Sequence, residues 1–351
     1  MISFARGAPA AECLAVEELA DCARAAIERD GAAVLGYGPG GGYAPLREWI
    51  AERHGVDPAR VVLTNGSLQG FVYLCEQLLP GRVLVEAPTY DRPLKILARL
   101  GAEVVPVAQD DEGLLVDEVA GPAAFLYVIP SFQNPSGRTL PLERRRALAE
   151  LARDGLLVLE DDPYGLVRFE GEPLPSVFEL AEGENVIYAS SFSKTAAPGL
   201  RVGYLVLPPR LAGSLEEIAV STTISPVLVG QATVLELIRR GRFEPNLERI
   251  RGLLRERRDA MLAALERSFP EGARWSRPEG GYFLWLDLPG VDTAELLTRS
   301  LAAGVAFVKG SDFFVPEGSG ESAARLAYSF ASPAEIEAGI ERLAALLPAH
   351  V

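Results

Sequence analysis

The sequence predicts an α/β protein built on a mostly parallel β-sheet and completed by a smaller α+β domain. From about Val61, short β-rich runs alternate with longer helical patterns, which is typical of βαβ units. Several runs are apolar on both faces, as in residues 125–129, and such strands are expected where helices cover both sides of a sheet. The pattern changes after about Ser225, where a long, charge-rich helical run at 245–269 precedes a second β-rich segment.

Seven strands are expected in the larger sheet, with helices between several of them. The expected strands are residues 61–64, 82–86, 103–107, 123–129, 156–160, 186–189 and 202–207, and the first helices are 67–79 and 92–100. For the smaller domain we expect strands near 281–287 and 325–330 and helices near 293–303 and 333–347. Pro333 suits an early helical position.

The bulk composition excludes several classes of function. The 351 residues carry a formal net charge of −14, which disfavours nucleic-acid binding through a general basic surface. No run approaches the roughly 20 apolar residues of a membrane span, and the N-terminus lacks a signal-peptide pattern, so a cytoplasmic protein is expected. His54 and His350 are the only histidines. We therefore predict no metal site and no Ser-His-Asp triad.

The most informative motif is SSFSKTAAPGLRVGY, which begins directly after a predicted strand. Lys194 lies among small hydroxyl residues, and a lysine that forms a Schiff base needs a partly desolvated pocket. Ser191, Ser193 and Arg201 could bind a phosphate monoester, which requires hydroxyl donors and a bidentate guanidinium. Taken alone, the motif could also be a polar loop with an exposed lysine.

SFSK followed by GLRVGY resembles the lysine signature of the fold-type-I, class I and II aminotransferases, which depend on pyridoxal 5'-phosphate (PLP). The pattern is most similar to the 2-aminoadipate and kynurenine aminotransferases and to the aminotransferase-like domain of certain PLP-dependent regulators. The similarity extends in order from Ser3 to Phe330. It implies that Lys194 holds PLP as a Schiff base. It also implies a large PLP-binding domain of residues 30–242 and a discontinuous small domain of residues 1–29 and 243–351.

A second motif, LEDDPYG, follows an apolar strand and places acidic residues where open α/β sheets bind ligands. A carboxylate against the pyridine nitrogen would keep the nitrogen protonated and make the ring an electron sink. The resemblance assigns this role to Asp161 rather than Asp162, and it has Tyr164 donate to the phenolic oxygen of the cofactor. Considered alone, the motif could be an acidic surface turn.

Three further motifs follow predicted strands and match cofactor contacts of the family. PSFQNPSG would place Asn134 at the phenolic oxygen, and EAPTY would stack Tyr90 on the cofactor ring. TNGSLQG would offer Ser67 and the backbone of Leu68 to the phosphate, since a helix N-terminus favours anions. Individually, they could be an ordinary turn, a packing tyrosine and a serine N-cap.

The resemblance also predicts residues that bind substrate. Arg325 would grip the α-carboxylate with its planar guanidinium, assisted by Asn134 and by the backbone of Gly7. Arg6 stands where the family commonly has glycine and could bind a distal carboxylate, or it could be solvated. Lys309 replaces a common proline, and the sequence starts immediately before the Gly7 loop, without the family's usual N-terminal arm. These departures leave substrate specificity open.

The segment YGPGGGYAPLR carries an interaction between subunits in similar enzymes. There the first tyrosine, Tyr37 here, reaches the phosphate of the neighbouring subunit, which implies a homodimer whose active sites are shared at the interface. The segment also satisfies a G-x-G-x-x-G nucleotide pattern through Gly36, Gly38 and Gly41. That pattern should follow a clear strand, and the candidate strand at 32–35 is short.

The predicted function is PLP-dependent amino-group transfer between an α-amino acid and a 2-oxo acid, with 2-oxoglutarate the expected acceptor, through the Schiff base of Lys194. The catalytic residues would be Lys194, Asp161 and Tyr164. Because the same fold and cofactor also serve lyases, racemases and decarboxylases, these reactions are the alternative. A ligand-sensing regulatory module is a further interpretation, but such regulators carry an additional DNA-binding domain.

Overall fold

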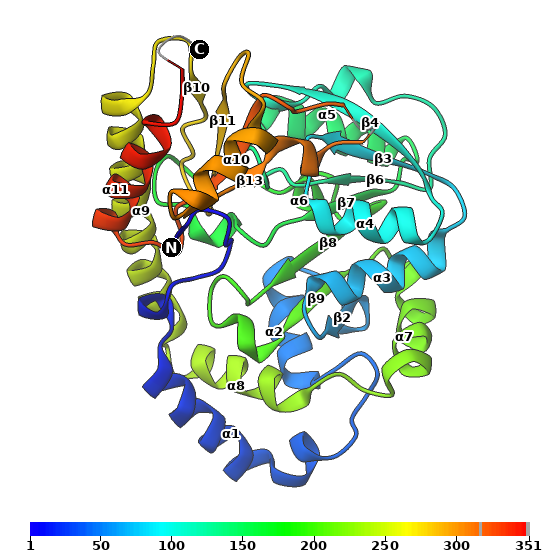
Figure 1. Ribbon diagram of the computed structural model, residues 1–351. Coiled ribbons are helices and arrows are strands. Elements are labelled where there is room, and N and C mark those ends of the chain that lie inside the picture. The colour runs from blue at the N-terminus through cyan, green and yellow to red at the C-terminus, as the bar shows by residue number, and fades with distance from the viewer. Residues whose placement is uncertain (316–317, 349–351) are drawn as a thin grey trace.

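The computed structural model describes residues 1–315 and 318–348, and its largest element is an eight-stranded sheet (Figure 1). The strand order is β2-β9-β8-β7-β6-β3-β4-β5. The strands are β2 (Val61–Thr64), β3 (Arg82–Ala87), β4 (Glu103–Asp110), β5 (Gly113–Leu114), β6 (Phe125–Val128), β7 (Val158–Asp161), β8 (Val186–Ser191) and β9 (Gly203–Val206). The seven expected strands are present. The eighth, β5, has only two residues and turns back on β4, too short to give a periodic signal.

The central strands of this sheet run parallel, as the apolar sequence runs indicate. β4, β3, β6, β7 and β8 pair in parallel, whereas β9 is antiparallel to both β8 and β2. β2 consequently points in the same direction as the central strands. The carboxyl ends of β2, β3, β6, β7 and β8 therefore lie along one edge of the sheet, where open α/β sheets bind ligands.

Helices cover both faces of the large sheet, which explains why its strands are apolar on both sides. Leucines of α3 (Ser67–Leu78), α4 (Asp91–Arg99) and α7 (Pro209–Thr223) pack on one face. The core on the other face takes residues from the first turns of α9 (Phe243–Ser268) and from five further helices. These are α1 (Val16–Leu35), α2 (Ala44–His54), α5 (Leu142–Arg153), α6 (Val177–Leu180) and α8 (Leu228–Arg239).

A second, smaller sheet has its own hydrophobic core. Its strand order is β10-β11-β14-β13, all antiparallel. The strands are β10 (Arg274–Trp275), β11 (Phe283–Asp287), β13 (Val308–Lys309) and β14 (Ala323–Ala327), and the helices are α9 (Phe243–Ser268), α10 (Thr293–Ala302) and α11 (Pro333–Ala344). In Figure 1, α9 and α11 run together on the far side of this sheet from the large one.

The N-terminal segment connects the two regions. β1 (Ile2–Ser3) pairs in parallel with β12 (Val305–Ala306), and the buried Phe4 packs in the core of the smaller sheet. The chain then runs to α1, which lies beside α8 in Figure 1, and Cys22 packs in the core of the large sheet. The domain boundaries at 30 and 243 stay a prediction. We propose that α1 belongs with the large sheet, because its buried residues pack there.

Two sequence expectations differ from the structure in detail. Residues 32–35 are not a strand but the last turn of α1, so the glycines at 36, 38 and 41 do not follow a β-strand as a nucleotide fingerprint would. The strand expected at 325–330 begins at Ala323 and ends at Ala327, which places Arg325 at its centre. Short apolar runs do not distinguish helix from strand by periodicity, and element ends are set by tertiary contacts.

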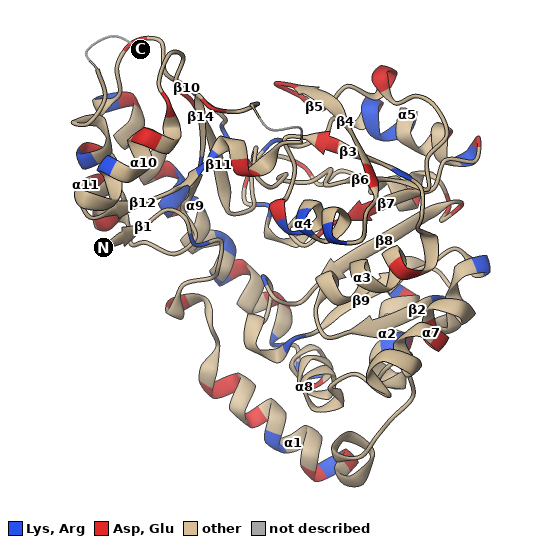
Figure 2. Cartoon of the chain, turned by 45° about the vertical axis from the view of Figure 1, so that its right-hand side comes forward, with Lys and Arg blue, Asp and Glu red and all other residues tan. Residues whose placement is uncertain are grey.

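Charged residues are distributed over the outer surface. Acidic and basic residues are interspersed along α1 and α4 on the face seen in Figure 2, within a chain of net charge −14. Among residues 1–315 and 318–348, no helix has the length and the apolar composition needed to cross a membrane.

Candidate active site

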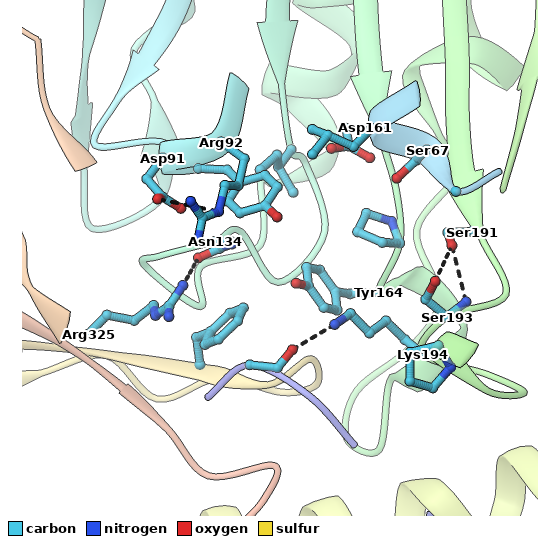
Figure 3. Close-up of a pocket in the computed structure, with 18 of the residues that line it drawn as sticks. Ser67, Asp91, Arg92, Asn134, Asp161, Tyr164, Ser191, Ser193, Lys194 and Arg325 are labelled. Atoms are coloured by element: carbon cyan, nitrogen blue, oxygen red, sulfur yellow. Dashed lines mark hydrogen bonds and ion pairs between the residues drawn. The ribbon is translucent and has the colours of Figure 1, made fainter. Parts of the chain in front are cut away.

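A cavity of about 370 Å³ opens at the carboxyl edge of the large sheet, where the smaller region faces it (Figure 3). Its walls come from the turns after β2, β3, β6, β7 and β8, together with the N-terminal loop and the strands β11 and β14. Twelve of the predicted site residues line it: Gly7, Ser67, Leu68, Tyr90, Asn134, Asp161, Tyr164, Ser191, Ser193, Lys194, Arg201 and Arg325. Residues more than 300 positions apart in the chain thus meet in one cavity.

Lys194 lies in the turn after β8 and points into the cavity (Figure 3). Its Nζ donates a hydrogen bond of 2.7 Å to the backbone oxygen of Gly7 and lies 4.9 Å from the ring centre of Tyr282. Burial lowers the pKa of Lys194 to about 8, and the positive charges of Arg325 and Arg201 act in the same direction. A neutral amine is therefore accessible near physiological pH, as Schiff-base chemistry requires.

Asp161 ends β7 and offers one free carboxylate oxygen to the cavity. Its Oδ2 accepts a hydrogen bond of 2.6 Å from the hydroxyl of Tyr127, whereas the buried Oδ1 has no partner among the described residues. Burial raises the pKa of Asp161 to about 6, although the hydrogen bond from Tyr127 lowers it. A cation next to Oδ1 would favour the charged carboxylate. A protonated ring nitrogen is a group of that kind.

The neighbouring carboxylate has a different environment. Asp162 accepts hydrogen bonds from the hydroxyl of Tyr188, at 2.8 Å, and from the backbone of Gly165, at 2.7 Å. Both Asp162 oxygens therefore have partners, and Asp162 does not line the cavity. This difference favours the choice of Asp161 over Asp162.

One end of the cavity gathers groups that suit a phosphate. The hydroxyls of Ser191 and Ser193 lie 2.8 Å apart, and the guanidinium of Arg201 donates to the backbone oxygen of Asn65 at 3.0 Å. Gly66 has φ of +93°, and a Cβ there would lie 2.2 Å from Nη2 of Arg201. At Gly203 a Cβ would lie 2.3 Å from the backbone nitrogen of Ser67. Both glycines allow the backbone to approach closely where α3 begins.

The opposite end of the cavity suits a carboxylate. Arg325 donates from Nη1 to Oδ1 of Asn134 at 2.8 Å and from Nη2 to the backbone oxygen of Ala5 at 2.9 Å. Its guanidinium lies 4.2 Å from the ring centre of Phe283, and its buried Nε has no partner in the described part of the chain. Burial lowers the pKa of Arg325 to about 10, so it remains a cation at neutral pH.

Hydrogen bonds hold the loop that carries Asn134. The side chain of Gln133 donates to Glu86 at 3.2 Å and to the backbone oxygen of Pro88 at 2.7 Å, and accepts from the backbone of Ser136 at 2.8 Å. Glu86 also accepts from the backbone of Ile129 at 2.9 Å. Burial raises the pKa of Glu86 to about 8. Glu86 was part of a recognised motif, but its contact with this loop could not be read from the sequence.

Two predicted site residues do not enter this cavity. Tyr37 has 85% of its surface exposed and lies outside the cavity of its own chain. Its assignment requires a neighbouring subunit and stays a prediction. Arg6 is exposed and stacks on Phe330, with 4.4 Å between its guanidinium carbon and the ring centre. The structure therefore does not bring Arg6 into the cavity, and its predicted binding of a distal carboxylate has no support from this geometry.

Several residues that line the cavity were not expected from the sequence. Pro163 lies between Asp161 and Tyr164 in the LEDDPYG motif, so the motif could have predicted its place in the cavity wall. Asp91 and Arg92 directly follow Tyr90. Gly66 and Ala5 directly precede the predicted Ser67 and Arg6 in the chain, whereas Ile129, Pro198 and Phe283 join the cavity through the fold.

The residues present fit PLP. Lys194 offers an amine of lowered pKa, the free oxygen of Asp161 offers a partner for a pyridinium nitrogen, and the hydroxyls beside Arg201 offer donors for a phosphate. Fold and site together define a PLP-dependent enzyme of fold type I, with an α/β large sheet and a smaller α+β region.

Comparison with known proteins identifies the family. The model of the family described as aminotransferase class I and II matches residues 1–343, and the chain belongs to this family. The 2-aminoadipate transaminase of Thermus thermophilus is 39% identical over 98% of this chain and 89% of its own length. The aromatic-amino-acid aminotransferase 1 of Thermococcus litoralis is 35% identical over 98% of this chain and 87% of its own.

A solved structure agrees with this result. The α-aminoadipate aminotransferase of Thermus thermophilus, complexed with N-(5'-phosphopyridoxyl)-L-leucine, superposes with a TM-score of 0.94 at 38% identity, covering 99% of this chain and 92% of that one. The protein is accordingly a PLP-dependent aminotransferase. The HTH-type transcriptional regulator TauR of Rhodobacter capsulatus is also similar, at 34% identity over 85% of this chain, but this chain covers only 63% of the regulator's length.

Proposed function

We propose that this enzyme moves the amino group of an α-amino acid to 2-oxoglutarate, with PLP attached to Lys194. The observation that carries the site assignment is the convergence of three groups on one cavity. They are the amine of Lys194, the unpaired Oδ1 of Asp161 and the guanidinium of Arg325. An amine, a carboxylate oxygen available to a ring nitrogen and a carboxylate-binding cation are the groups that PLP-dependent transamination of a 2-oxo acid requires.

The remaining assignments follow from position in the cavity. Ser67, the backbone of Leu68, Ser191, Ser193 and Arg201 would hold the phosphate. Tyr90 would stack on the cofactor ring. Asn134 and Tyr164 would bind its phenolic oxygen. This assignment is consistent with the Asn134 side chain, whose oxygen accepts from Arg325 while its amide nitrogen donates to no described residue.

Bound PLP supplies an electron sink for the negative charge that develops at the substrate α-carbon. Asp161 keeps the ring nitrogen protonated through Oδ1, while Tyr127 holds the other oxygen. Arg325 orients the α-carboxylate so that the α-proton faces Nζ of Lys194. That nitrogen accepts the proton from the α-carbon and returns it as a general acid, which its pKa of about 8 permits.

Borohydride reduction of the holoenzyme, followed by peptide mapping, tests the attachment. We expect the label on Lys194 because it lies inside the cavity, whereas Lys95 and Lys309 lie outside it. A label on either of those two would contradict the assignment. With an amino acid alone, the aldehyde-form absorbance should disappear, and 2-oxoglutarate should restore it. Restoration by other 2-oxo acids but not by 2-oxoglutarate would contradict the proposed acceptor.

We further propose a cytoplasmic homodimer in which Tyr37 reaches the phosphate of the partner subunit. The exposure of Tyr37 in the single chain, at 85%, supports a partner for this side chain. Tyr37→Phe should weaken PLP binding several-fold, since one hydrogen bond contributes about 1 kcal/mol. Sedimentation should detect a dimer. A fully active monomer would contradict the shared site.

A further inference from the structure

Arg92 is a positively charged residue of the cavity to which none of the roles proposed above assigns a function. It lines the same cavity as Lys194 and Arg325. The phosphate end already has Arg201, and the α-carboxylate already has Arg325. An additional arginine at the rim, with 58% of its side chain exposed, therefore remains available to a substrate.

Among the described residues, the guanidinium of Arg92 makes a long ion pair with Asp91 but no hydrogen bond. Its nearest acidic group is Asp91, with 3.8 Å between Nε and Oδ2, and no hydrogen bond engages Arg92 among the described residues. The same oxygen of Asp91 accepts a hydrogen bond of 2.7 Å from Lys95. Lys95 thus shares the charge of Asp91 with Arg92, and the guanidinium donors of Arg92 make no hydrogen bond to the described residues.

The backbone that carries Arg92 is firmly placed. Arg92 occupies the first turn of α4, and the buried Leu94 and Leu97 anchor this helix in the core of the large sheet. Thr89 donates a backbone hydrogen bond of 2.9 Å to Phe313, which connects the turn before α4 to the smaller region. The position of Arg92 relative to the cavity is therefore fixed, while its side chain keeps the freedom to reach a ligand.

Arg92 and Arg325 lie on the same side of the cavity, with Asn134 between them (Figure 3). The two cations are close enough for the charge of Arg92 to lower the pKa of Arg325. A ligand with two carboxylates separated by a short chain would neutralise both cations. A ligand with one carboxylate would leave Arg92 uncompensated.

We propose that Arg92 binds the distal carboxylate of a dicarboxylic substrate and so selects acidic amino acids and their 2-oxo acids. This inference rests on the proposed function, since it uses Arg325 as the α-carboxylate site. Planar guanidinium groups suit carboxylates because they donate two parallel hydrogen bonds. Arg6, for which the sequence left open either this role or a solvated position, stands outside the cavity.

The test compares ligands of equal length that differ in one carboxylate. In the holoenzyme, Arg92→Gln should lower kcat/KM for L-glutamate about 10- to 100-fold more than for L-norvaline, the loss expected for a charge-assisted hydrogen bond. Calorimetric titration with glutarate and pentanoate gives a readout that needs no turnover. The variant should weaken glutarate binding by a similar factor relative to pentanoate.

The matched control is Arg99→Gln, which removes an exposed arginine from the last turn of the same helix, outside the cavity. It should leave both ratios as in the wild type. Equal losses for the two ligands of a pair in Arg92→Gln, or a selective loss in Arg6→Gln instead, would overturn the assignment to Arg92. A wild-type enzyme that transaminates no amino acid would overturn the proposed function itself, so the two failures are distinguishable.

Discussion

The two ends of the active-site cavity are built in different ways. The cofactor end uses residues at the carboxyl ends of neighbouring strands, such as Asp161 on β7 and the Ser191–Lys194 turn after β8. The substrate end joins Arg325 of β14 to the backbone of Ala5, which is 320 positions away in the chain. One end depends on a single sheet, whereas the other depends on the contact between two regions with separate cores.

Because of this difference, we expect the cofactor end to determine the reaction rate and the substrate end to determine which substrates bind. Strands of one sheet are held in register by a continuous ladder of hydrogen bonds, so the groups at their ends keep their relative positions. The substrate end is held by a few side-chain contacts, such as the hydrogen bond of 2.8 Å between Arg325 and Asn134. Changes at the cofactor end should therefore alter the rate for every substrate, and changes at the substrate end should alter binding and selectivity.

The largest effect of this kind is expected at Asp161. Asp161→Asn keeps the size of the side chain but removes the charge that holds the ring nitrogen protonated. We expect PLP to stay bound and kcat to fall about 100- to 1000-fold for acidic and apolar amino acids alike, a loss typical of removing one electrostatic stabiliser. Stopped-flow half-reactions with each amino acid measure the effect. A loss confined to one substrate class would contradict the separation of the two ends.

A smaller effect is expected at Arg325. Arg325→Ala removes the charged hydrogen bonds to the α-carboxylate, so KM for amino acids and 2-oxo acids should rise about 10- to 100-fold. Arg325→Lys should recover only part of the affinity, since a lysine lacks the planar pair of donors. Steady-state kinetics for both half-reactions check this. If kcat alone falls, with KM unchanged, Arg325 does not belong to a binding end.

The smallest effect tests whether the two ends interact electrostatically. The pKa of Lys194 is lowered to about 8 by burial and, next, by Arg325. Only the neutral amine reacts with an aldehyde, so the rate of PLP uptake by the apoenzyme should rise with pH through about 8. Arg325→Gln removes a nearby positive charge, which favours the protonated amine, and should move this midpoint to higher pH.

Arg99→Gln serves as the control for this titration, because Arg99 lies outside the cavity and its charge is exposed to solvent. Its midpoint should equal that of the wild type. If Arg325→Gln has no effect on the midpoint either, the lowered pKa of Lys194 does not depend on the charge of Arg325.

The sequence by itself determined the sheet and the residues of the cofactor end. Apolar runs show which strands are buried. Each cofactor motif lies at the end of its strand or within a few positions after it, and Asp161 is the last residue of β7. Where strands are parallel, the residues that follow their carboxyl ends lie along one edge of the sheet, regardless of the length of the connecting helices. The strand pattern therefore predicted where a ligand would bind, and the resemblance to the class I and II aminotransferases assigned Asp161, Asn134 and Lys194 to that place, where all three line one cavity.

Only the tertiary structure decided which side chains join the predicted Arg325, Asn134 and Gly7 at the substrate end. Whether an arginine faces the cavity or the solvent depends on packing between distant segments, and the chain has many exposed arginines of similar local sequence. The sequence left open whether Arg6 binds a distal carboxylate or is solvated. In the structure Arg6 stacks on Phe330 outside the cavity, whereas Arg92 lines the cavity. Similarly, Tyr127 and Glu86 act through contacts with Asp161 and Gln133 that no spacing in the sequence encodes.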